Sequence, residues 1–209
     1  SKVLETTADA FNDLEIAIFS AGSDNSIKFA PEAVKRGCVA IDNSSAFRME
    51  KNVPLVIPEI NGDALDNHQG IIANPNCSSA VALMALYPLH KRFGLRRFFA
   101  STYQAVSGAG ALGPICLDRE ISEKNGIVFE GNASESVFAH PIAYNLIPHI
   151  DEFRDDGYTK EELKMRNESR KILGLSELEV SCTCVRVPVY RAHSICINAE
   201  FRQTVNIPD

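Results

Sequence analysis

The chain has 209 residues, of which 45% are hydrophobic and 23% charged, and its formal net charge is −6. This composition is typical of a globular protein with one large domain, or one domain and part of another. The acidic balance argues against a general nucleic-acid surface, and no apolar run reaches the ~18 residues of a membrane span. We therefore expect neither a nucleic-acid nor a membrane partner.

Six cysteines are scattered through the chain, and none pairs with another at the spacing of a zinc site. This pattern predicts no metal and a reducing, cytoplasmic compartment, with one reactive thiol and five buried structural ones. The six are Cys38, Cys77, Cys116, Cys182, Cys184 and Cys196.

Apolar strands alternate with a helix in the first third of the chain. We expect strands over residues 14–19, 38–41, 55–59 and 70–73, and a helix over 26–36 that Gly37 ends. Such alternation is typical of a doubly wound, Rossmann-like parallel sheet, whose ligands bind at the carboxyl ends of the strands. The polar turns 20–22 and 43–45 are therefore expected to share a crevice with Cys77.

The segment 74–79 places Cys77 between an apolar strand and a helix. The positive end of a helix favours a thiolate, which lowers the pKa of a thiol from about 8.5 and makes the sulfur a nucleophile. The alternative is a small buried residue beside a helix that Asn76 caps. The polar neighbours Asn76, Ser78 and Ser79 favour the nucleophile.

The rest of the chain predicts an α+β domain. We expect the helix after Cys77 to break near Pro88, and Thr159 and Glu162 to form a capping box at the start of a helix that ends near Leu173. Other expected features are a strand over 97–106, a small-residue turn over 107–110, a helix over 113–123, a mixed region over 126–157 and strands within 179–201. The predicted domains are 1–76 and 77–209.

Three residues of the second domain are candidates for chemistry. His193 is the best proton-transfer partner for Cys77, and its alternative is a core histidine with satisfied hydrogen bonds. Gln104 ends an apolar strand, where its amide meets either a turn or a ligand. Arg186 lies in an apolar strand, where arginine is rarely unpaired. Arg186 and His193 are an odd number of residues apart, so a straight strand would place them on opposite faces. Pro188 and the pair Arg191-Ala192 favour a bend or bulge between them. Arg48 and Lys164 are further candidate anion binders, with surface charges as the alternative.

Eight segments, in order, together resemble the aspartate-semialdehyde dehydrogenase family. They are Ser20–Gly22, Asp42–Arg48, Val56–Asn61, Asn74–Cys77, Gln104–Gly110, Asn145–Pro148, Glu161–Lys164 and Arg186–Ser194. Any one of these segments could occur by chance, but the ordered set covers nearly the whole chain and is specific for this family. The resemblance implies a partial Rossmann-like domain, without its glycine-rich loop, followed by an α+β catalytic and dimerisation domain.

The resemblance also implies catalytic roles. Cys77 resembles the nucleophile, His193 the acid/base and Gln104 the residue that positions the substrate at the thiol. Asn76, with the N–H of Cys77, would stabilise the oxyanion. For binding, it implies Arg186 for the substrate carboxylate, Glu161 for the ammonium, Arg48 and Lys164 for phosphate, and Ser20, Ala21, Gly22, Ser107 and Gly108 for NADP.

The implied reaction interconverts aspartyl phosphate with aspartate semialdehyde and phosphate, in the biosynthesis of lysine, threonine and methionine, through a thioester on Cys77. A homodimer or homotetramer is expected. The chain looks truncated at both ends, so that by itself we expect it to bind NADP poorly and to be inactive. Two alternatives stay open: an N-acetylglutamyl-phosphate reductase, in which Glu161 would meet no ammonium, and a non-catalytic remnant that dimerises.

Overall fold

The computed structural model describes residues 3–131 and 136–206. The chain forms two compact units, Ser1–Arg92 with Asn167–Leu178, and Phe93–Arg166 with Glu179–Asp209. Helix α5 (Lys160–Leu173) contributes residues to both units. The predicted class, a parallel Rossmann-like sheet followed by an α+β domain, is confirmed. The units differ from the predicted division after residue 76, because the first unit continues to Arg92 and residues 167–178 return to it.

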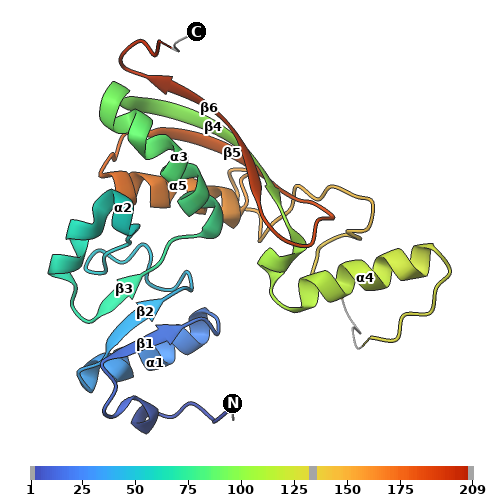
Figure 1. Cartoon of the computed structure of the whole chain (residues 1–209), viewed down its shortest axis with the longest axis horizontal. Coiled ribbons are helices and arrows are strands. Elements are labelled where there is room, and N and C mark those ends of the chain that lie inside the picture. The colour runs from blue at the N-terminus through green and yellow to red at the C-terminus, as the bar shows by residue number, and fades with distance from the viewer. Residues whose placement is uncertain (1–2, 132–135, 207–209) are drawn as a thin grey trace. The chain divides into compact units, whose positions relative to one another are not determined.

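The first unit is built on a parallel sheet in the order β1-β2-β3. Its elements are η1 (Ala8–Phe11), β1 (Ile16–Phe19), α1 (Ser23–Lys35), β2 (Val39–Asp42), α2 (Pro58–Asn61), η2 (Gly62–Asn67), β3 (Ile71–Ala73) and α3 (Cys77–Phe93). The three strands lie side by side with α1 against them (Figure 1). Phe11 packs against Phe29 and Ala33 of α1 in a small hydrophobic core. Gly37 follows this helix and has φ +82°, which fits its predicted role of ending the helix.

Two predictions about the first unit are wrong. Residues 55–59 form no strand: Leu55 makes a single bridge to Ala73, and Pro58 begins α2. Proline suits the first turn of a helix, and the side chain of Asn61 binds the N–H of Ile57 at 2.9 Å and the carbonyl of Leu55 at 2.9 Å. These side-chain bonds serve the backbone of Leu55 and Ile57, whereas the N–H of Val56 between them donates to the carbonyl of Ala73 at 3.1 Å.

Helix α3 also does not break at Pro88 but continues to Phe93. A proline inside a helix removes one backbone hydrogen bond. Here Leu83 and Leu86, one turn earlier, are buried, and packing of such an apolar face is the main source of helix stability in proteins.

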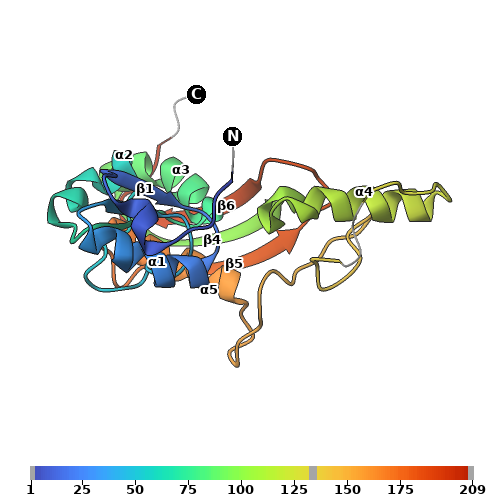
Figure 2. The ribbon, with the colours of Figure 1, turned by 90° about the horizontal axis from the view of Figure 1, so that it is seen from below.

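The second unit is built on a mixed sheet in the order β5-β4-β6. Its elements are β4 (Leu95–Gln104), η3 (Val106–Ala109), α4 (Leu112–Lys124), β5 (Glu179–Arg186), β6 (Ser194–Phe201) and the first half of α5. Strand β4 pairs parallel with β5 and antiparallel with β6. Helix α4 follows the end of β4 and extends beyond the sheet (Figure 2).

The two faces of this sheet differ in burial. Along β4, Phe98, Ala100 and Gln104 are buried, whereas Phe99 is 52% and Tyr103 45% exposed. Of the predicted mixed region 126–157, residues 132–135 lie outside the described residues; Ile142 and Ile147 within it pack on Leu117 of α4. No helix of the described residues is long and apolar enough to cross a membrane.

The predicted capping box at the start of α5 is confirmed. The N–H of Thr159 donates to Oε2 of Glu162 at 2.7 Å, and the N–H of Glu162 donates to Oγ1 of Thr159 at 3.3 Å. Oε1 of Glu162 also accepts the N–H of Cys184 at 3.0 Å, so the box ties α5 to the edge of β5.

Replacing Thr159 by Ala is expected to lower the free energy of unfolding by about 1–2 kcal/mol, because one helix N–H loses its acceptor. Urea denaturation of the variant measures the change. Thr204→Ala, which alters an exposed threonine, serves as the control. Equal midpoints for the two variants would contradict the assignment.

Candidate active site

The three strands of the first unit end at one edge, as predicted. The N–H of Asn43 donates to the carbonyl of Phe19 at 2.9 Å, and the N–H of Asn74 donates to that of Asp42 at 2.8 Å. The side chains of Asn74 and Asn43 are joined by a further hydrogen bond of 2.9 Å. The loops after β1, β2 and β3 are thereby tied into one polar surface.

The start of α1 lies at this edge and fits a negatively charged group. Gly22 has φ +89°, no side chain caps the helix, and Ser20, Ala21 and Gly22 are exposed. An open helix N-terminus preceded by glycine is a common place for a nucleotide phosphate or a nearby cofactor group. These residues therefore fit part of a dinucleotide.

Cys77 is the first residue of α3 and is exposed. Asn76 caps the helix, since its Oδ1 accepts the N–H of Ser78 at 2.8 Å and its carbonyl accepts that of Ala80 at 2.9 Å. Asn76 therefore caps the helix, as the alternative prediction stated, but Cys77 beside it is exposed and not buried. Oδ1 of Asn76 therefore serves as the acceptor of the helix cap.

Arg48 is not a surface charge but is 8% exposed. Its Nε donates to the carbonyl of Asn74 at 2.8 Å, Nη2 to the carbonyl of Asn43 at 2.9 Å, and Nη1 to Oε1 of Glu168 at 3.1 Å. Three of its five N–H groups therefore bind the chain itself. This guanidinium joins the loops at the strand ends.

In the second unit, Gln104 and Arg186 are register partners at the ends of β4 and β5, and both are buried. Nε2 of Gln104 donates to Oε1 of Glu161 at 3.2 Å. Nζ of Lys164 donates to Oε2 of the same glutamate at 3.3 Å. The predicted ammonium site thus already binds one ammonium, that of Lys164.

A second carboxylate also faces Lys164. Nζ of Lys164 donates to Oδ2 of Asp151 at 2.9 Å. Burial works against the charge of Lys164, but Asp151 and Glu161 outweigh it and raise the pKa of Lys164. Burial likewise opposes the ionised form of Asp151, but the hydrogen bond from Lys164 prevails and lowers the pKa of Asp151. A phosphate at Lys164 would compete with these two carboxylates.

Gly108 lies against both Arg186 and His193. A Cβ at this glycine would stand 2.6 Å from Nη1 of Arg186 and 3.2 Å from Nε2 of His193. The neighbouring Ala105 also binds both, since its carbonyl accepts Nη1 of Arg186 at 2.8 Å and its N–H donates to Nδ1 of His193 at 3.1 Å. Ser107, in the same turn, donates its N–H to the carbonyl of Tyr190 at 3.2 Å.

The predicted bend between Arg186 and His193 is confirmed. Strand β5 ends at Arg186 and β6 begins at Ser194, and Ala192 between them has φ +71°. This left-handed residue turns the chain before β6. His193 and Arg186 therefore meet the same glycine instead of pointing to opposite faces.

The hydrogen bond from Ala105 also fixes the proton of His193. A backbone N–H can only donate, so Nδ1 carries the lone pair and the neutral ring holds its proton on Nε2. Burial lowers the pKa of His193, and the nearby Arg186 lowers it further, while Glu161 partly offsets both. The imidazole is neutral at pH 7, with Nε2–H as its donor.

This lowered pKa has a consequence for stability. Between the unfolded value of about 6.5 and the lower folded value, the unfolded chain binds more protons at this residue, so the stabilisation present above pH 6.5 is lost as the pH falls. We expect His193→Asn to lose less unfolding free energy than the wild type between pH 7 and pH 5. Urea denaturation at both pH values measures this, and equal losses would contradict it.

Glu168 was not among the predicted residues; it is 1% exposed and binds both Arg48 and the N–H of Asn76. A signal was present: Glu161, Lys164 and Glu168 stand at spacings of three and seven, on one helical face. Apolar residues at these spacings predict a buried helix face, whereas charged residues at the same spacings predict a face exposed to solvent.

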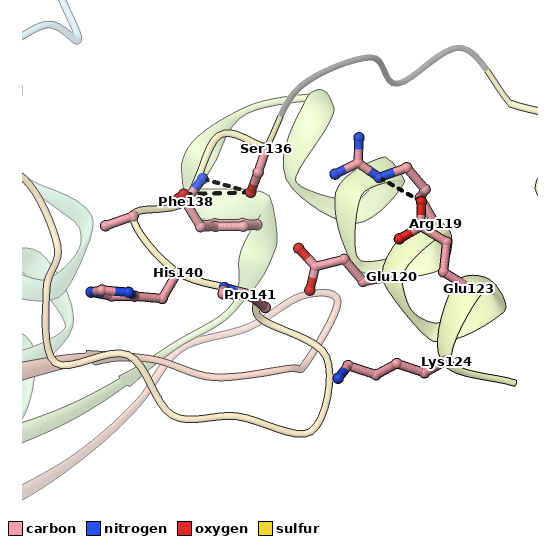
Figure 3. A pocket seen from close by; sticks show the side chains of 9 residues that line it. Arg119, Glu120, Glu123, Lys124, Ser136, Phe138, His140 and Pro141 are labelled. Atoms are coloured by element: carbon pink, nitrogen blue, oxygen red, sulfur yellow. Dashed lines mark hydrogen bonds and ion pairs between the residues drawn. The ribbon is translucent and has the colours of Figure 1, made fainter.

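A pocket of about 430 Å³ lies outside the predicted site, between α4 and residues 136–141 (Figure 3). Arg119, Glu120, Phe138 and His140 line it. Glu120 uses Oε2 to accept the N–H groups of Ile142 and Ala143 at 2.6 and 2.9 Å, which fixes this loop. None of the predicted site residues lines the pocket. Within residues 3–131 and 136–206, no group of three or more possible ligands could hold a metal ion.

Comparisons with known proteins show the family to which the chain belongs. Residues 1–68 match the family model "Semialdehyde dehydrogenase, NAD binding domain", and residues 86–209 match "Semialdehyde dehydrogenase, dimerisation domain". The chain belongs to the semialdehyde dehydrogenase family.

Similar proteins include several aspartate-semialdehyde dehydrogenases. The Bacillus subtilis enzyme is 46% identical over 206 residues, which cover 95% of this chain and 58% of that protein. The structure of aspartate semialdehyde dehydrogenase II from Vibrio cholerae, complexed with ASA, has a TM-score of 0.87 at 43% identity, covering 93% of this chain and 58% of that chain. The Candida albicans enzyme with NADP has a TM-score of 0.66 at 25% identity, covering 93% and 52%. The chain thus spans just over half the length of these proteins.

Proposed function

We propose that the protein, in its natural full length, interconverts L-aspartate 4-semialdehyde and phosphate with L-4-aspartyl phosphate, using NADP. The observation that carries the proposal is the cluster of Arg186, Glu161, Gln104 and His193 around one buried strand end. An amino-acid substrate has a carboxylate for Arg186 and an ammonium for Glu161. The similar enzymes named above support this choice.

In the reductive direction, Cys77 attacks the acyl carbon, the bond to phosphate breaks, and a thioester forms on the sulfur. NADPH, when bound, supplies the hydride that reduces this carbon. His193 donates a hydrogen bond from Nε2–H to the substrate oxygen, and the amide of Asn76 with the N–H of Cys77 can stabilise its charge. The C–S bond then breaks to release the aldehyde. The proposal requires the thiol of Cys77 and the imidazole of His193 to face one substrate.

The remaining binding roles also belong to the proposal. Arg48 and Lys164 would bind the phosphate, Lys164 by exchanging a carboxylate partner for it. The start of α1 at Ser20–Gly22 and the turn at Ser107–Gly108 would lie against the cofactor, for which an open helix N-terminus and exposed glycines are suitable. The choice of NADP over NAD rests on the similar Candida albicans enzyme.

We also infer that the protein forms a homodimer or homotetramer through the open face of the β5-β4-β6 sheet. Phe99 and Tyr103 are about half exposed there, and large exposed apolar groups on a sheet face are typical of an interface. The match to a dimerisation domain supports this inference. Sedimentation of the full-length protein tests it, and a monomer at micromolar concentration would contradict it. A cytoplasmic location stays a prediction.

The function is tested by assaying the full-length protein with phosphate and either NADP or NAD. Aspartate semialdehyde and N-acetylglutamate semialdehyde are compared as substrates. We expect at least a hundredfold higher kcat/KM for aspartate semialdehyde, because an acetylated amine carries no charge and cannot form the proposed ion pair with Glu161. A preference for N-acetylglutamate semialdehyde would establish the reductase alternative, and no turnover of either would favour the remnant.

A further inference from the structure

Glu168 on α5 connects two parts of the candidate site within the first unit. Its Oε1 accepts Nη1 of Arg48 at 3.1 Å, and its Oε2 accepts the N–H of Asn76 at 2.7 Å. The side chain is 1% exposed, so both oxygens are removed from water. One carboxylate thus binds the guanidinium between the strand-end loops and the peptide group directly before Cys77.

Each of these contacts restrains a residue with a role in the proposed reaction. Asn76 caps the helix that Cys77 begins, so fixing its N–H fixes the turn that presents the sulfur. Arg48 also binds the carbonyls of Asn43 and Asn74, so its guanidinium has one orientation. One turn further along α5, Lys171 donates to the carbonyls of Arg48, Glu50 and Val53, each at 2.8 Å. This face of α5 therefore holds the segment after β2.

We propose that Glu168 is a positioning residue, which holds the turn before Cys77 in place and neutralises Arg48 beside it. The inference rests on the proposed role of Cys77 as the nucleophile. It assigns Glu168 no contact with substrate or cofactor.

The charge of Glu168 is as important as its shape. An unpaired carboxylate near the sulfur would disfavour a thiolate, whereas the Arg48–Glu168 pair is neutral overall. Burial raises the pKa of Glu168, and Arg48 and the N–H of Asn76 counteract that effect. Two donors, one of them a guanidinium, face its two oxygens and stabilise the ionised form.

The experiment compares Glu168→Gln and Glu168→Asp in the full-length protein. The first measurement is the rate at which iodoacetamide alkylates Cys77, identified by peptide mass, from pH 6 to pH 9. In Glu168→Gln the guanidinium of Arg48 loses its counter-charge, so the thiolate is favoured and alkylation at pH 7 becomes about fivefold faster. Glu168→Asp keeps the charge, so its alkylation rate stays within about twofold of the wild type.

The second measurement is steady-state kinetics. Both variants are expected to lose at least tenfold in kcat, because the amide has one acceptor oxygen and cannot accept from both Arg48 and the N–H of Asn76, and the shorter aspartate cannot reach both partners. Glu120→Gln is the matched control, since Glu120 is another buried carboxylate that binds two backbone N–H groups. Its alkylation profile should equal that of the wild type.

The proposal is overturned when Glu168→Gln alkylates at the wild-type rate or more slowly, or when both variants shift alkylation equally, which would indicate packing alone. Thermal melting verifies folding. Should Glu168→Gln not fold, a tenfold lower kcat with unchanged alkylation in Glu168→Asp supports the proposal, and wild-type kcat overturns it. Alkylation requires no substrate, so it tests the role of Glu168 independently of the proposed function. A wild-type protein without dehydrogenase activity would refute the proposed function alone.

Discussion

Replacing Cys77 by Ser is expected to lower kcat of the full-length protein by at least about a thousandfold. A hydroxyl at the start of α3 is far less acidic than a thiol, so the helix N-terminus cannot convert it to an anion near neutral pH. The fold should be retained, because Cys77 is exposed and serine is similar in size. Turnover of aspartate semialdehyde with phosphate and NADP measures the loss.

Cys196→Ser is the matched control, since Cys196 is the other exposed thiol among the described residues. It lies on β6, away from the strand ends that carry Gln104 and Arg186, and pairs with Ser101 in the middle of β4. Its kcat should remain within a few-fold of the wild type. Substantial activity in Cys77→Ser would show that sulfur is not the nucleophile.

Gly108→Ala is expected to reduce kcat/KM by about a hundredfold or more. The added methyl group would lie 2.6 Å from Nη1 of Arg186, a distance that real Cβ atoms essentially never show, and 3.2 Å from the ring of His193. Arg186 cannot move without breaking its 2.8 Å hydrogen bond to Ala105. Displacing Arg186, which is proposed to bind the substrate carboxylate, and His193, which is proposed to donate a hydrogen bond to the substrate, misaligns the substrate. Steady-state kinetics with aspartate semialdehyde gives the loss.

Gly62→Ala is the matched control, because a Cβ at Gly62 meets nothing within 4 Å. Both variants should melt near the wild-type temperature, which separates an effect on the site from an effect on the fold. Wild-type kcat/KM in Gly108→Ala would mean that Arg186 and His193 do not act where they meet this glycine.

Features encoded over short stretches of sequence were predictable. The capping box at Thr159 and Glu162 needs only two side chains three residues apart, and Gly37 ends α1 by its own backbone freedom. The bend before His193 followed from an odd separation and a proline. The ordered segments of the family resemblance identified the family, which the comparisons confirm.

Features that depend on partners distant in sequence were not predictable. Arg48 looked like a surface charge, but it is buried, and the carboxylate that pairs with it, Glu168, lies 120 residues later in the chain. Residues 55–59 have the composition of a strand, but the side chain of Asn61 hydrogen-bonds to the N–H of Ile57 and the carbonyl of Leu55. Pro88 is tolerated because the packing of α3 outweighs one lost hydrogen bond. The return of residues 167–178 to the first unit has no local signal.

The central claim is that Cys77 carries the substrate as a thioester that phosphate then releases. The most direct measurement mixes the full-length protein with aspartate semialdehyde and NADP without phosphate, quenches it in acid and identifies the acylated peptide by mass. We predict an aspartyl group on the peptide that contains Cys77, which disappears when phosphate is added before the quench. An active enzyme that carries the group on another residue, or on none, would contradict the account.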